Sequence, residues 1–194
     1  MKIIMLMLVL AIVQGLAIKV SASEKDDPGS IFDSILSRYV SEGGLVDYKG
    51  LKEDKGFKKY IEYLSNTDPG RLPSDKHRMA FWINAYNAFV IKGILEVYPI
   101  KSVRNIGWIP NSFFKRKKFK IENGEITLQV LENEKLREAF REPRIHFAIN
   151  CASISCPKLL TEAYSAGKLE EQLEVQAVSF INDKSRNYLD KGNK

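Results

Sequence analysis

The sequence is poor in the residues that most often hold metal ions or redox centres. It has two histidines, His77 and His146, and two cysteines, Cys151 and Cys156. The Cys-x4-Cys spacing lacks the short separation that is usual in zinc sites. It also differs from the Cys-x-x-Cys of thiol redox proteins, which disfavours a redox role. We therefore expect no metal ion and no cofactor.

The motifs of several enzyme classes are also missing. The chain has no glycine-rich phosphate loop and no Gly-x-Ser-x-Gly elbow, which excludes nucleotide-dependent enzymes and serine hydrolases. It has no internal repeat or low-complexity tract of the kind found in solenoids or disordered tails. The formal net charge is +6 and falls to +4 if Lys2 and Lys19 are removed with a leader. This mild basic balance gives no reason to expect a nucleic-acid partner.

The N-terminus is typical of an export signal, which we place at residues 1–22. Lys2 is followed by an apolar run over residues 3–13 and by the small-residue pattern Val-Ser-Ala at residues 20–22. Polar residues interrupt the run before it reaches the roughly 18–20 apolar residues of a membrane-spanning helix. We expect cleavage after the signal, a periplasmic or secreted protein without a stable membrane span, and one domain at residues 23–194.

Helical periodicity dominates the rest of the chain. Strand signals are fewer: Asn123-Gly124 predicts a hairpin between two short runs, and the apolar run IHFAI at residues 145–149 predicts a central strand. Thr127 is expected to cap the helix that follows the hairpin. The predicted class is α+β. The other helices are expected at residues 31–40, from residue 57 to 64, from Ser74 or Asp75 to the residues before Pro99, and at about residues 168–181.

The longest predicted helix carries two asparagines in an apolar setting. Asn84 and Asn87 are three residues apart and share a face. An unpaired buried amide costs on the order of 1–3 kcal/mol, so both side chains must find hydrogen-bond partners. They are therefore either structural clamps or residues of a site.

The stretch RIHFAINCASISCP, residues 144–157, contains one histidine and both cysteines. A cysteine nucleophile attacks as a thiolate, and His146 is a suitable proton acceptor near neutral pH. In an extended strand His146 and Cys151 lie on opposite faces, whereas Cys156 is freer to fold back. Three interpretations stay open: a catalytic pair, a packed and inert thiol, or a disulfide, which export permits and which needs α-carbons within about 7 Å.

The segments AFWINAYNAFVIKGIL and IHFAINCASISCP resemble the DUF547 family, a domain of unknown function found in bacterial exported proteins and in plants. The resemblance covers most of the mature chain and implies a distant similarity to papain and transglutaminase-like cysteine peptidases. In that fold a central helix packs on a small antiparallel sheet with surrounding helices. The catalytic cysteine starts the central helix, and this chain has none there. The family pattern Ile-Glu-His is kept at Glu132, while Asn133 replaces its histidine.

These observations lead to two hypotheses of function. In the first, a thiol-dependent amide hydrolase or acyltransferase acts on a peptide or amide substrate. His146 would deprotonate Cys151 or Cys156, and Asn84 or a backbone amide would stabilise the oxyanion. Asn84 or Glu132 would orient the imidazole. We favour Cys151 as the nucleophile. The alternative is a non-catalytic binding module of the cell envelope on a degenerate papain-like fold.

The binding-module alternative places a peptide or amide-containing ligand beside the WINAYN helix, where Trp82 and Asn87 are candidate binding residues. A free thiol within hydrogen-bond reach of His146 would distinguish the enzyme from the binding module. The sequence gives no prediction of the oligomeric state.

Overall fold

The computed structural model describes residues 28–107, 109, 111–122 and 124–187. The predicted export signal lies outside these residues. Within the described ranges, no helix combines the length and the apolar character that crossing a membrane requires.

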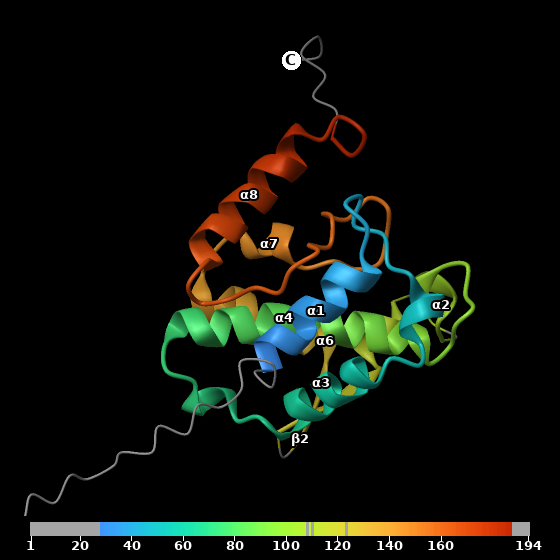
Figure 1. The fold of residues 1–194 in the computed structure, drawn as a ribbon, viewed down its shortest axis with the longest axis horizontal. Helices are drawn as coiled ribbons and strands as arrows, with labels where there is room; N and C mark the ends of the chain where they lie inside the picture. The colour runs from blue at the N-terminus through green and yellow to red at the C-terminus, as the bar shows by residue number, and fades with distance from the viewer. Residues whose placement is uncertain (1–27, 108, 110, 123, 188–194) are drawn as a thin grey trace, which may run out of the picture.

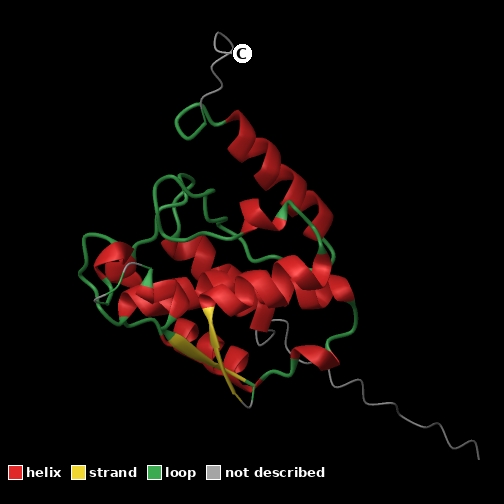
Figure 2. Ribbon diagram, turned by 180° about the vertical axis from the view of Figure 1, so that it is seen from behind, coloured by secondary structure: helices red, strands yellow, loops and turns green. Residues whose placement is uncertain are grey.

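The described chain is mostly helical and contains one β-hairpin (Figures 1 and 2). The long helix α4 runs through the middle in both views. Helices α7 and α8 lie on one side of α4, and α3 and the hairpin lie on the other. The elements are α1 (Pro28–Tyr39), α2 (Tyr48–Leu51), α3 (Lys55–Asn66), η2 (Pro69–Arg71), α4 (Asp75–Leu95), η3 (Val103–Asn105), α5 (Ser112–Lys115), β1 (Lys118–Ile121), β2 (Gly124–Thr127), α6 (Leu128–Val130), η4 (Leu131–Glu138), α7 (Ile145–Ala148) and α8 (Leu169–Asn182).

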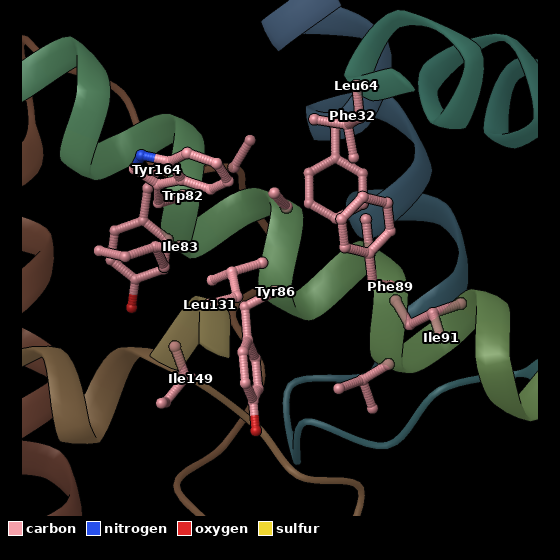
Figure 3. Close-up of a cluster of buried hydrophobic side chains, with 14 of the residues drawn as sticks. Phe32, Leu64, Trp82, Ile83, Tyr86, Phe89, Ile91, Leu131, Ile149 and Tyr164 are labelled. Carbon is pink, nitrogen blue, oxygen red and sulfur yellow. The ribbon is translucent and has the colours of Figure 1, made fainter. Parts of the chain in front are cut away.

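Helix α4 forms the centre of the core, as its sequence predicts. It begins after Ser74, whose side chain accepts a hydrogen bond from the backbone N–H of His77 and so caps the helix. Every residue from 80 to 91 is buried, so all sides of this helix are covered. Figure 3 shows its side chains reaching both Phe32 of α1 and Leu131 at the start of η4.

The predicted hairpin is confirmed. Strands β1 and β2 pair antiparallel with Phe119 opposite Ile126, and both side chains are buried. The ring of Phe119 stacks on Phe89 of α4, with centroids 4.9 Å apart, which fixes the hairpin to the central helix. Thr127 caps α6, as predicted. The fold is thus mostly helical with a two-stranded antiparallel sheet, and a papain-like fold is not confirmed.

The predicted strand at residues 145–149 is wrong. Residues 145–148 form the helical turn α7, which starts after Pro143, whose carbonyl accepts from the N–H of His146. Ile145 and Ala148 are buried three residues apart, and α7 packs against α8. A short apolar run fits a buried helical turn as well as a strand. In the described chain, β1 and β2 pair only with each other, so residues 145–149 have no strand partner.

Candidate functional site

The two cysteines form a disulfide. Their α-carbons lie 6.2 Å apart, and the described residues contain no free cysteine. A disulfide sulfur has no thiolate to offer as a nucleophile. In this state neither Cys151 nor Cys156 can play the catalytic part predicted for it, and the structural-disulfide interpretation holds.

Asn84 and Asn87 act as clamps on residues 148–165, which comprise the last residue of α7 and the irregular segment after it, and which we call the clamped segment. The Asn84 Nδ2 donates to the carbonyl of Tyr164 at 2.8 Å, and its Oδ1 accepts from the Tyr164 N–H at 2.9 Å. Asn87 likewise donates to the Ala148 carbonyl at 3.0 Å and accepts from the Asn150 N–H at 2.9 Å. Both amides therefore bind backbone on their donor and acceptor sides, which is the structural-clamp alternative for these two residues.

Two glutamines of α8 hold the clamped segment in the same way. Gln172 Nε2 donates to the Ala163 carbonyl at 2.9 Å, and Gln176 Nε2 donates to the Lys158 carbonyl at 2.6 Å. Both side chains are 4 % exposed. Carboxamides from α4 and α8 therefore supply bonds that a neighbouring strand would otherwise provide. Their sequence signal is a pair of amides four residues apart, each directly before a buried apolar position, Leu173 or Ala177, and it was missed.

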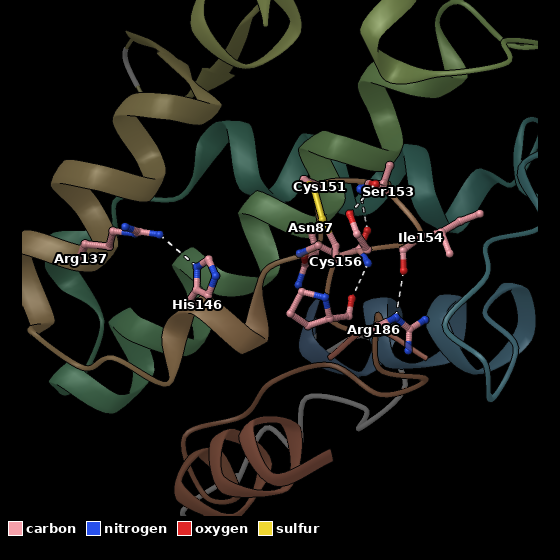
Figure 4. The surroundings of a disulfide bond; sticks show 12 residues. Asn87, Arg137, His146, Cys151, Ser153, Ile154, Cys156 and Arg186 are labelled. Carbon is pink, nitrogen blue, oxygen red and sulfur yellow. Dashed lines mark hydrogen bonds between the residues drawn. A yellow bond between two sulfur atoms is a disulfide. The ribbon is translucent and has the colours of Figure 1, made fainter. Parts of the chain in front are cut away.

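His146 belongs to a different polar cluster, on the side of η4. Its Nδ1 lies 3.1 Å from Nη2 of Arg137, and the same Nη2 lies 2.9 Å from Oε1 of Glu132. In Figure 4 the imidazole points toward Arg137 and away from the disulfide. A guanidinium only donates, so Nδ1 accepts and the neutral ring carries its proton on Nε2. The structure thus connects His146 to Glu132 through Arg137.

Glu132 also touches the core. Burial raises the pKa of the Tyr86 phenol, and the negative charge of Glu132 with its hydrogen bond to the phenol raises it further. Tyr86 is 2 % exposed, so the cluster runs from the buried side of α4 to the surface at His146. The phenol stays protonated over the physiological range and is a donor toward the carboxylate.

Glu132 and Arg137 are five residues apart and lie on a π-helical stretch, η4. Hydrogen bonds from residue i to i+5 define the π-helix. This geometry is rare in proteins, and where it occurs it is often part of a functional site. The C-terminal end of η4 opens on a surface hollow of about 450 Å³. We call it the arginine hollow. It is lined by Arg137, Arg141, Glu142, Pro143 and His146.

Trp82 lies apart from this cluster. It is 9 % exposed, packs edge-on against Phe81 with ring centroids 5.3 Å apart, and lines a surface hollow beside the hairpin. Asn87 does not line that hollow. The structure therefore does not bring the two predicted binding residues into one groove.

Comparison with known proteins addresses the identity of these elements. The pattern of the family described as "Protein of unknown function, DUF547" matches residues 71–181, more than half of the chain. The chain belongs to the DUF547 family. Searches of curated proteins and of solved structures found no match. The matched range of this DUF547 domain contains the central helix, the π-helical stretch, the disulfide and nearly all of α8.

One rim of the arginine hollow in the DUF547 domain is fixed by Arg144. Its guanidinium contacts Glu142 at 2.7 Å, Glu170 at 2.9 Å and Glu174 at 3.3 Å, which ties the start of α7 to α8. The hydrogen bond from Arg144 holds the pKa of Glu142 below its ordinary value of 4.5. Glu142 is therefore ionised and compensated at neutral pH.

Replacing Arg144 by glutamine is expected to lower the free energy of unfolding by about 1–2 kcal/mol at pH 7. Glu170 and Glu174 are mostly exposed and add little, so the pair with Glu142 carries most of the effect. Because the folded pKa of Glu142 is depressed, its contribution is present above pH 4.5 and is lost as the pH falls through the folded pKa.

Denaturant unfolding of both proteins between pH 3 and 7 checks this prediction. The matched control is Lys118→Gln, which removes an exposed pair with Glu125 at 3.1 Å and should change stability by less than about 0.5 kcal/mol. A stability difference for Arg144→Gln that is the same at pH 3 and pH 7 would contradict it.

Proposed function

We propose that this DUF547 domain is a non-catalytic binding module of an exported protein. The observation that carries the proposal is the disulfide between Cys151 and Cys156, which removes the nucleophile that the thiol-enzyme hypothesis needs. A disulfide is also what an oxidising compartment outside the cytoplasm maintains, which supports export.

The side chains that the thiol-enzyme hypothesis places beside the thiolate, Asn84 and His146, have other partners. Asn84 binds the backbone of Tyr164, and His146 contacts Arg137. The first contact holds the clamped segment against α4, and the second holds the imidazole beside Arg137 at the arginine hollow. They support binding over thiol-dependent hydrolysis or acyl transfer.

Alkylation of the purified protein with iodoacetamide tests the proposal. Without reductant, peptide mapping should find no label on Cys151 or Cys156 between pH 5 and 9, because both sulfurs are oxidised. After reduction, labelling should follow the pH profile of an ordinary thiol and should be the same in His146→Ala, because His146 activates neither cysteine. Rapid labelling of one cysteine at low pH, slowed by His146→Ala, would instead establish an activated thiolate and overturn the proposal.

A further inference from the structure

The arginine hollow has more donors than the protein itself uses. Arg141 is exposed, and its side chain has no ion pair or hydrogen bond with any residue in the described part of the chain. Arg137 uses Nη2 for both Glu132 and His146, so its Nη1 and Nε have no partner among the described residues. His146 adds an Nε2–H whose partner is likewise absent from the described chain. A ligand with acceptor oxygens would satisfy all three side chains.

Neighbouring contacts keep the donors of this hollow in place. The η4 geometry sets Arg137 against Glu132, and the contact with His146 fixes the imidazole tautomer. Glu142, the one carboxylate among the described residues that line the hollow, is held by the Nε and Nη2 of Arg144 at 2.9 and 2.7 Å. Both oxygens of this carboxylate are thus turned toward Arg144, and Arg141, which forms no ion pair with Glu142 in the described chain, keeps its guanidinium available.

We propose that the arginine hollow binds the carboxylate of a peptide, with Arg141 as the main anchor and Arg137 and His146 as additional donors. The inference rests on the proposed function, because it assigns the site at which the binding module takes its ligand. A planar guanidinium matches a carboxylate with two parallel N–H···O bonds. The volume of about 450 Å³ accommodates the end of a chain or one acidic side chain.

The charge around the hollow favours a carboxylate over a phosphate. Arg137 is paired with Glu132, and Arg144 is paired with Glu142, Glu170 and Glu174. Arg141 has no carboxylate partner among the described residues. The single positive charge of Arg141 is therefore uncompensated at the hollow. A singly charged carboxylate balances it, whereas a phosphate group carries about 1.5–2 negative charges at pH 7 and would leave an excess.

Titration of the ¹⁵N-labelled, disulfide-bonded protein tests the site by NMR. The probe is N-acetyl-trialanine with a free carboxylate, compared with the same peptide amidated at its C-terminus and with inorganic phosphate. The free-acid peptide should shift the Arg141 Nε–H and His146 ring signals in the millimolar range, and the amidated peptide should not. Arg141→Gln should weaken binding about tenfold or more, because it removes a charged hydrogen-bond donor pair.

The matched control is Arg116→Gln, which removes an exposed arginine that does not line the arginine hollow and should leave the affinity unchanged. Three results would overturn the proposal. The acid and amide peptides could cause equal shifts, phosphate could bind more tightly than the peptide, or Arg141→Gln and Arg116→Gln could lose the same affinity for the free-acid peptide. No shift with the free-acid peptide would also overturn it. The alkylation experiment tests the proposed function separately from this site. If the cysteines are oxidised and the peptide does not bind, the non-catalytic module stands and this binding site is rejected. If one cysteine is an activated thiolate and the peptide binds, the site stands and the non-catalytic module is rejected.

Discussion

Replacing Asn84 or Asn87 by alanine is expected to lower the free energy of unfolding by about 2–4 kcal/mol. Each change removes two hydrogen bonds to the clamped segment and leaves one carbonyl and one N–H of the backbone without that partner. The two asparagines are 6 % and 3 % exposed, so water does not readily replace the lost bonds. Denaturant unfolding with the disulfide intact, followed by far-UV circular dichroism, measures the change.

Two further variants separate the hydrogen bonds from other effects. Asn84→Asp keeps the size of the side chain but replaces the donor that faces the Tyr164 carbonyl, so it should be destabilising as well. Gln129→Ala removes an amide from an exposed position of α6 and should stay within about 0.5 kcal/mol. If Asn84→Ala were as mild as Gln129→Ala, the clamps would not stabilise the fold.

Gly44→Ala is expected to cost about 2–4 kcal/mol. Gly44 has a φ of +78°, where a Cβ is unfavourable. An added Cβ would also lie 2.8 Å from the backbone nitrogen of Leu159 and 2.9 Å from Cα of Lys158. Those atoms belong to the clamped segment, so they cannot move aside as the end of a flexible side chain would. Thermal and denaturant unfolding of the variant provide the measurement.

The adjacent Gly43 supplies the control. A Cβ at Gly43 meets only Ser41 Oγ at 3.6 Å, and its φ is not in the left-handed region. Gly43→Ala should therefore change stability by less than about 0.5 kcal/mol. Equal losses for the two alanine variants would show that the loop, and not the close approach of Gly44 to the clamped segment, determines the effect.

Local signals in the sequence predicted most helices of this fold. The apolar periodicity located α1, α3, α4 and α8, and Ser74 was one of two proposed caps for α4. The strand prediction for residues 145–149 was wrong because the burial of this segment depends on α8, which lies more than 20 residues later in the chain. An apolar run of five residues carries no information about that partner.

The candidate site was less accessible to prediction. The need of Asn84 and Asn87 for partners follows from their burial, but the partners lie about 60 to 80 residues downstream. His146 and Glu132 were proposed as neighbours, and the structure joins them through Arg137, which was missed. Charged residues on a helix surface are ordinary, and a spacing of five residues does not share a face in an α-helix. Only the π-helical geometry of η4 makes Glu132 and Arg137 neighbours.

The clamps also affect the order in which a growing chain can complete its core. The Asn84 carboxamide is synthesised 80 residues before Tyr164, whose backbone it binds, and Asn87 precedes Ala148 by 61 residues. A fragment that ends before residue 148 therefore has a central helix with two unsatisfied amides on an otherwise apolar surface. Vectorial synthesis leaves that surface exposed until the last quarter of the chain emerges, which makes truncated products targets for chaperones and proteases.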